Sequence, residues 1–195
     1  MIIWGNEGNR LRRFARAGVA LLASGAVLLP GAASASAAPT GGIMYYHNGF
    51  ESPDQRNAWT LTREGDGVAT DVGYQPWART GQCLGYLYAH YGTVRYGIWV
   101  GIPANSIACS ARIHIAHGLC AQGATLFSAI DQRGEYRATT SSVPLPPTGY
   151  APVTLTDIPL RPGDTALRFV VTLAGVGDPG QGTKYVDDLE VQCSY

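Results

Sequence analysis

The stretch Ala108-Cys109-Ser110-Ala111-Arg112-Ile113-His114-Ile115-Ala116 decides the fold class, because small or apolar residues alternate in it with polar ones. Successive side chains of an extended strand point to opposite faces. This period of two therefore predicts a strand with one buried face and one outward face. The buried face would carry Cys109, Ala111, Ile113 and Ile115, and the outward face Ser110, Arg112 and His114.

Similar short runs recur along the chain, between breaks rich in Gly, Pro, Asn and Asp. They predict further strands at residues 84–91, 93–102, 124–131, 151–155, 166–175 and 184–193. No helical period is sustained over a comparable length. Short strands separated by turn signals are typical of an all-β fold in which two antiparallel sheets pack as a β-sandwich.

The first 37 residues have the composition of a secretory signal peptide. Arginines gather between Arg10 and Arg16, an apolar run follows from Ala17 to Leu29, and Ala35-Ser36-Ala37 matches the spacing of a cleavage site. The apolar run of about 13 residues is shorter than the roughly 20 residues that a membrane span needs. We therefore predict a secreted, extracellular protein with a signal peptide over residues 1–37 and a single domain over residues 38–195.

The predicted mature chain has a nearly balanced charge. The signal contains four of the 14 basic residues and one of the 14 acidic residues, which leaves residues 38–195 with a net charge of −3. This charge provides no basic surface for nucleic acid or for an anionic membrane. We expect neither of these partners.

All four cysteines lie in the predicted mature chain. An even number in an exported protein predicts two disulfide bonds, with three possible connectivities. The cysteines are scattered and lack Cys-x-x-Cys spacing, which argues against a zinc site. Cys109 and Cys193 both fall on the apolar faces of their strands, so they can pair inside the core if those strands are neighbours. Cys83 and Cys120 then pair by elimination.

Three short motifs carry a resemblance to a known family: Asn48-Gly49-Phe50-Glu51, Trp59, and Tyr185-Val186-Asp187-Asp188-Leu189-Glu190-Val191. Together they resemble the galactose-binding-like jelly-roll carbohydrate-binding modules that are attached to bacterial cellulases and xylanases. The resemblance runs from about Ile43 to the end of the chain. The closing segment is also similar to that of small secreted actinobacterial proteins of unknown function. The family resemblance implies a jelly-roll β-sandwich and carbohydrate binding, although many such modules lack disulfides.

The same resemblance implies a structural calcium ion between Glu51 and Asp187. The alternation of the last strand places Asp187 on the side of Leu189 and Val191, and a buried carboxylate needs a cation, an arginine or several donors. Calcium would take about six to eight oxygen ligands from carboxylates and carbonyls. The alternative is that Asp187 lies at the edge of the sheet or pairs with an arginine.

Aromatic and polar side chains gather on the outward faces of the predicted strands. Sugar-binding sites use flat aromatic faces for the C–H side of a sugar ring and polar groups for its hydroxyls. The candidate ligand-binding residues are Trp77, Tyr86, Tyr88, Trp99, Arg112 and His114. The alternative is that they are ordinary strand formers, some of which pack under loops. Trp59 matches a core position of the resembling family and is expected to be structural.

Signatures of catalysis are absent from the sequence, which has no His-Glu-x-x-His, no Gly-x-Ser-x-Gly and no phosphate-binding glycine loop. A glycosidase needs two carboxylates across a cleft, and the sequence singles out no such pair. It therefore predicts a secreted, non-catalytic protein that binds a polysaccharide or a cell-surface glycan. Two alternatives stay open: an envelope or protein-interaction module of the same fold, and a small polysaccharide hydrolase or lyase.

Overall fold

The computed structural model of the chain describes residues 41–73, 76–141, 143–177 and 182–195. The predicted signal peptide lies outside the described residues, so export stays a prediction. The described elements are β1 (Ile43–Asn48), α1 (Pro53–Asn57), β2 (Trp59–Gly73), β3 (Cys83–Gly101), β4 (Ala108–Ala121), β5 (Ala124–Asp131), β6 (Tyr136–Thr139), β7 (Tyr150–Pro159), β8 (Ala166–Val176) and β9 (Gly182–Ser194). Among these residues, no helix is both long and apolar enough to cross a lipid bilayer.

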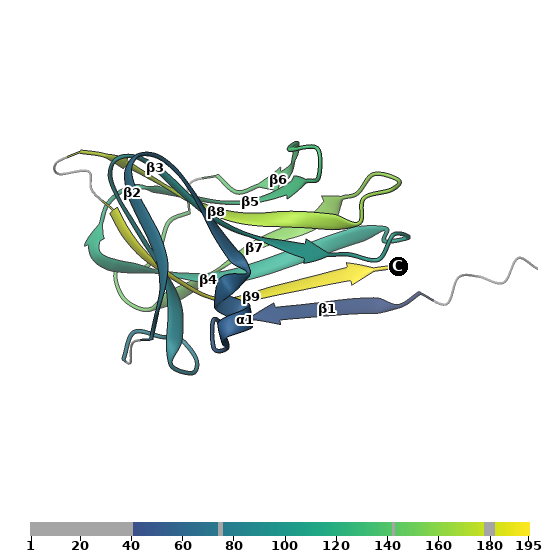
Figure 1. Cartoon of the computed structure of the whole chain (residues 1–195), viewed down its shortest axis with the longest axis horizontal. Coiled ribbons are helices and arrows are strands. Elements are labelled where there is room, and N and C mark those ends of the chain that lie inside the picture. Colours follow the sequence, from purple (N-terminus) through teal and green to yellow (C-terminus); the bar gives the residue numbers. More distant parts are fainter. Residues whose placement is uncertain (1–40, 74–75, 142, 178–181) are drawn as a thin grey trace, which may run out of the picture. The chain divides into compact units, whose positions relative to one another are not determined.

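The strands form two antiparallel layers that share β3 (Figure 1). The first half of β3, Gly85–Ala89, pairs with β9, which also pairs with β1 and with β4, and β7 follows β4. The second half, Tyr91–Gly101, pairs with β8, and β5 and β6 follow. We name these layers the β4–β9 sheet and the β3–β8 sheet; β2 pairs along β3. The chain is an all-β jelly-roll β-sandwich, as predicted.

One hydrophobic core joins the two sheets. The predicted apolar face of β4, from Cys109 to Ile115, is at most 2% exposed and belongs to the same cluster as Ile98 and Phe169 of the β3–β8 sheet. Each large apolar side chain buried there contributes roughly 1.5–3 kcal/mol. Trp59 is structural, as expected, because its ring stacks on those of Phe50 and Tyr96.

The predicted disulfide between Cys109 and Cys193 is confirmed. The two residues lie directly opposite each other on β4 and β9, and both are 1% exposed. The bond therefore joins two neighbouring strands inside the core, as the alternation of both segments indicated.

The predicted bond between Cys83 and Cys120 is wrong, because Cys83 is a free thiol. Strands β3 and β4 lie on opposite sides of β9. Their pairing places Cys83 level with residue 188 of β9 and Cys120 level with about residue 183. Along β9 this separation amounts to roughly 17 Å, whereas the Cα atoms of a disulfide lie within about 7 Å of each other.

Residues 84–91 and 93–102, predicted as two strands, are one strand in the structure. Gly92 lies between them with φ +112°, and a Cβ at this position would come within 2.1 Å of the Glu64 carbonyl oxygen on β2. Glycine therefore lets β3 continue past the point where another residue would end it. Strands β1, β2 and β6 were not predicted. They are paired on one side only or are short, so their sequences need little apolar alternation.

The Asn-Gly-Phe-Glu segment, residues 48–51, forms the corner between β1 and α1. Asn48 Oδ1 accepts hydrogen bonds from the Phe50 backbone N–H at 3.1 Å and from Trp59 Nε1 at 3.2 Å. These bonds hold Phe50 at φ +63°, a conformation that is costly for a residue other than glycine. The segment is thus a structural corner, and it directs the side chain of Glu51 toward the beginning of β3.

Candidate functional site

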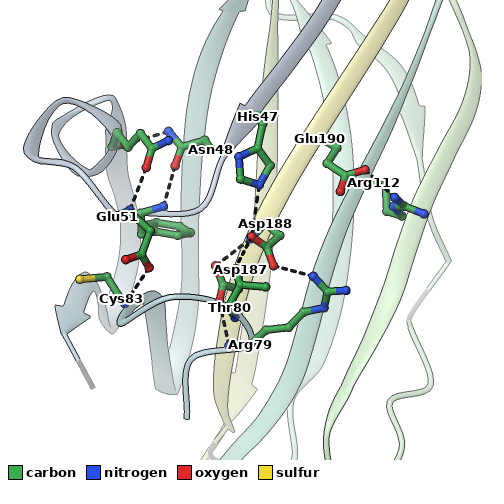
Figure 2. A network of polar contacts seen from close by, with 12 residues as sticks. His47, Asn48, Glu51, Arg79, Thr80, Cys83, Arg112, Asp187, Asp188 and Glu190 are labelled. Atoms are coloured by element: carbon green, nitrogen blue, oxygen red, sulfur yellow. Dashed lines mark hydrogen bonds and ion pairs between the residues drawn. The ribbon is translucent and has the colours of Figure 1, made fainter. Parts of the chain in front are cut away.

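A β-bulge in β9 brings two carboxylates to the same side of the strand. Asp188 has φ +47°, and the register with β4 shifts beside it. The backbone N–H groups of Arg79 and Thr80 donate to Asp187 Oδ2 at 2.9 and 3.3 Å, and the side chains of the same two residues donate to Asp188 at 2.6 and 2.8 Å (Figure 2). The prediction that Asp187 shares the core face of Leu189 is therefore wrong, because the extra residue of a bulge reverses the alternation.

The two carboxylates differ in pKa despite their proximity. Burial, followed by the negative charge of Asp188, raises the pKa of Asp187 to about 6. Burial also acts to raise the pKa of Asp188, but hydrogen bonds from Thr80, Arg79 and His47 outweigh it and lower this pKa. Burial and the charge of Arg79 lower the pKa of His114, which lies on the adjacent part of β4, so His114 is neutral at pH 7.

Glu51 binds the same loop from the other side. Its carboxylate accepts hydrogen bonds from the backbone N–H groups of Gln82 at 3.0 Å and Cys83 at 2.9 Å. Gly81, between the two groups of donors, has φ +60°, and a Cβ there would come within 2.5 Å of all three atoms of the Glu51 carboxylate group. Residues 79–83, which we name the anchored loop, are thus held by carboxylates at both ends.

These contacts bear on the predicted calcium ion. Calcium binds oxygen ligands, whereas Glu51 and Asp187 each accept hydrogen bonds from N–H groups of the anchored loop. Within the described part of the chain, no three His, Cys, Asp or Glu side chains are grouped so that they could hold a metal ion. The arrangement does not favour an ion shared by these two carboxylates, and the calcium site stays a prediction.

The side of the β4–β9 sheet that faces away from the core, which we name the outer face, carries a row of polar side chains. His47, Glu190, Arg112 and Thr154 follow one another across β1, β9, β4 and β7. Arg112 forms an ion pair with Glu190 (Figure 2), which neutralises both charges. Two open pockets of about 230 and 200 Å³ adjoin here and share Ser110 and Gln192 in their linings.

An aromatic pocket lies further along the same face. The ring of Trp77 stacks on Tyr185 with centroids 5.7 Å apart, and the Tyr150 hydroxyl donates to the Trp77 carbonyl oxygen at 2.8 Å. These residues line a pocket of about 260 Å³. Ala116, beneath it, is four residues along β4 from Arg112, so the aromatic pocket and the polar row are about 13 Å apart.

The predicted binding residues do not form one platform. Trp77, Tyr86 and Arg112 lie on the outer face, with Tyr86 tilted against Tyr185, and Tyr88 follows Tyr86 on the same side of β3. His114 shares the face but is only 6% exposed, so it supports the surface from below. Trp99 lies on the β3–β8 sheet, because β3 changes sheets between Tyr88 and Trp99. A ligand-binding role for any of them stays a prediction.

Several residues of this face were missed by the sequence reasoning. Glu190 and Gln192 alternate with the apolar residues of β9, so their outward direction could be read from the sequence, but nothing marked them as lining a pocket. Tyr150 and Tyr185 meet only through the pairing of β9 with β4 and of β4 with β7, which no local pattern shows.

Comparison with solved structures finds the same fold in several carbohydrate-binding modules. The xylan-binding CBM22-1 domain of Xyn10C from Paenibacillus barcinonensis has a TM-score of 0.55 at 13% identity, over 80% of this chain and 97% of that one. The xylan-binding module CBM15 has a TM-score of 0.54 at 12% identity, over 78% and 97%. TmCBM61, solved with β-1,4-galactotriose, has a TM-score of 0.52 at 12% identity, over 70% and 88%. At this identity the likeness shows the fold alone.

No protein-family model matches the chain, and no curated protein does either. The resemblance to small secreted actinobacterial proteins therefore finds no support, whereas the resemblance to β-sandwich carbohydrate-binding modules is confirmed at the level of the fold.

Proposed function

We propose that this chain is a secreted, non-catalytic protein that binds a neutral polysaccharide along the outer face of its β4–β9 sheet. The observation that supports this most directly is the placement of an aromatic pocket and a polar, open groove on one face. The solved structures of the same fold include modules described as binding xylan and β-1,4-galactotriose.

The two parts of the face suit the two sides of a sugar ring. The exposed ring of Trp77, backed by Tyr185, offers a flat apolar surface for the C–H side. Arg112, Glu190 and Gln192 offer donors and acceptors for hydroxyl groups. Because about 13 Å separates these parts, the face suits a chain of several sugars better than a single sugar.

The charges of the face favour a neutral ligand. Arg112 is neutralised by Glu190, and the Arg79 side chain, which points to the same region, is held by Asp188. An acidic sugar would have to displace one of these carboxylates. The hydroxyls of a neutral sugar can instead join the ion pair without breaking it.

The carboxylates of the bulge are poorly placed for catalysis. Asp187 and Asp188 are 0% and 2% exposed, and both are engaged by the anchored loop. Glu190 lines the groove but is half-buried and paired with Arg112. A glycosidase would need two carboxylates that reach the scissile bond, and none of these three is available in that way.

A depletion assay with insoluble xylan, β-1,4-galactan and cellulose tests the proposal. Trp77→Ala and Arg112→Ala should each weaken binding to the preferred polysaccharide about tenfold or more, as truncation of a central contact does. The matched control is Arg63→Ala, since Arg63 is an exposed arginine on β2 in the other layer, and it should leave binding unchanged.

Three results would contradict the proposal. Absence of binding to every polysaccharide would favour the protein-interaction module. Release of reducing ends from any of them would favour the hydrolase or lyase. Equal losses of affinity in Trp77→Ala, Arg112→Ala and Arg63→Ala would show that the outer face is not the binding site.

A further inference from the structure

We propose that the β3–β8 sheet carries a second and separate binding surface, for an acidic polysaccharide, formed by Trp99, Arg168 and Tyr136. The pairing register places these residues in one row across the sheet. Trp99 of β3 lies opposite Arg168 of β8, Arg168 opposite Ile130 of β5, and Ile130 opposite Tyr136 of β6.

The row faces away from the core. Ile98 and Val100, on either side of Trp99, are buried, and so are Leu167 and Phe169 on either side of Arg168. Because side chains alternate along a strand, Trp99 and Arg168 themselves point outward. Trp99 is 47% exposed and Tyr136 is 61% exposed, so two flat rings are available at the two ends of the row.

The guanidinium of Arg168 lies over Gly97, two residues before Trp99 on the same side of β3. Gly97 has no side chain, and a Cβ there would lie 3.0 Å from Arg168 Nε. Arg168 can therefore extend across β3 and donate from Nη2 to Thr60 Oγ1 on β2 at 3.0 Å. This contact fixes the guanidinium on the surface but leaves its charge uncompensated.

The uncompensated charge indicates the chemistry of the partner. Arg95 on the same sheet is paired with Glu64 at 2.8 Å, and Arg112 on the opposite sheet is paired with Glu190. Arg168 has no carboxylate partner among the described residues; its Nε is buried there without an acceptor, so a ligand would meet the terminal Nη groups. A guanidinium with an uncompensated charge beside an exposed indole matches a sugar that carries a carboxylate: the carboxylate binds Arg168, and the ring stacks on Trp99.

The overall charge of the protein does not attract an acidic polysaccharide, because the predicted mature chain has a net charge of −3. An acidic polysaccharide would be repelled on average, so any affinity must arise from a local arrangement. The surface also lies on the opposite sheet from the outer face. A test of binding at this surface therefore gives a result that is independent of the proposed function.

Affinity electrophoresis in gels containing sodium polygalacturonate tests the inference, with neutral β-1,4-galactan as the comparison. Polygalacturonate should retard the wild type, and the Trp99→Ala and Arg168→Gln substitutions should each weaken the affinity for polygalacturonate about tenfold or more. Tyr136→Ala should weaken it by a smaller factor, and added NaCl should weaken it further. Arg63→Gln, which removes one positive charge elsewhere, is the matched control and should behave as the wild type.

The inference is overturned if polygalacturonate does not retard the wild type, or if Arg63→Gln and Arg168→Gln lose the same amount of affinity for it. It is also overturned if Trp77→Ala and Arg112→Ala abolish polygalacturonate binding while Trp99→Ala does not, since the ligand would then occupy the outer face. Because Trp99 and Tyr136 are exposed, their variants should melt within about 2 °C of the wild type, which separates loss of binding from loss of folding.

Discussion

Replacing both Cys109 and Cys193 by Ala should lower the free energy of unfolding by about 4.5 kcal/mol. The bond spans a sequence separation of 84 residues, and the entropy of closing a loop of that size in the unfolded chain corresponds to about 4.5 kcal/mol at 25 °C. Both sulfur atoms lie in the core, so alanine leaves small cavities that add to the loss. Since the total stability of a domain is about 5–15 kcal/mol, the effect should be large.

Denaturation in guanidinium chloride, followed by tryptophan fluorescence, measures this loss, because Trp59 is buried in the core. The same change corresponds to a fall in melting temperature of about 9 to 18 °C for a chain of this size. The matched control is Cys83→Ala, which removes a half-buried free thiol. It should change the free energy of unfolding by less than about 1 kcal/mol.

Two results would refute the reasoning. A loss below about 2 kcal/mol in the double variant would show that the loop-closure entropy does not govern the contribution of this bond. A Cys83→Ala variant destabilised as strongly as the double variant would show that Cys83 is bonded after all, and that the alignment of β3 and β4 on β9 is different from the one described.

Two further predictions concern the carboxylates of Asp131 and Glu51. Hydrogen bonds from the backbone N–H groups of Glu135 and Arg133, with the charges of Arg137 and Arg161, hold the pKa of the buried Asp131 below its usual value. A carboxylate with a lowered pKa stabilises the fold above the unfolded pKa of about 4, and this stabilisation is lost as the pH falls below that value. Urea titrations from pH 7 to pH 2 should therefore show Asp131→Asn less stable than the wild type at pH 7, with a difference that shrinks below pH 4. Glu51→Gln should lower the melting temperature by about 2 to 4 °C, since weaker bonds to the anchored loop cost about 1 kcal/mol, and EDTA should leave the wild type unchanged. A drop with EDTA that calcium restores would instead support the predicted calcium ion.

Local alternation in the sequence was sufficient to predict the strands that pack on both sides of the core. Side chains from Cys109 to Ile115 on β4, and from Leu189 to Cys193 on β9, lie on the faces that a period of two assigns to them. The Cys109–Cys193 disulfide followed from the same pattern. These predictions succeeded because the buried side of a central strand has to be apolar along its whole length.

The predictions that failed depend on pairing between distant segments. The direction of Asp187 is reversed by a bulge that β9 forms against β4. Trp99 is separated from Arg112 because β3 pairs with β9 in its first half and with β8 in its second half. Alternation assigns each side chain to a side of its own strand. It does not say in which sheet that part of the strand lies.

The residues that carry the family resemblance act on the outer face indirectly. Asn48 and Phe50 form a corner from which Glu51 reaches the anchored loop, and Asp187 holds the other end of that loop. Trp77, the aromatic surface of the proposed site, lies two residues before this loop and is stacked on Tyr185 of the strand that also carries Asp187. The motif residues therefore hold the anchored loop in place, while side chains outside the motif would determine which ligand is bound. For this reason the fold alone does not identify a ligand, and the charge balance of each face, neutralised at Arg112 and uncompensated at Arg168, is the better guide to the ligand proposed for it.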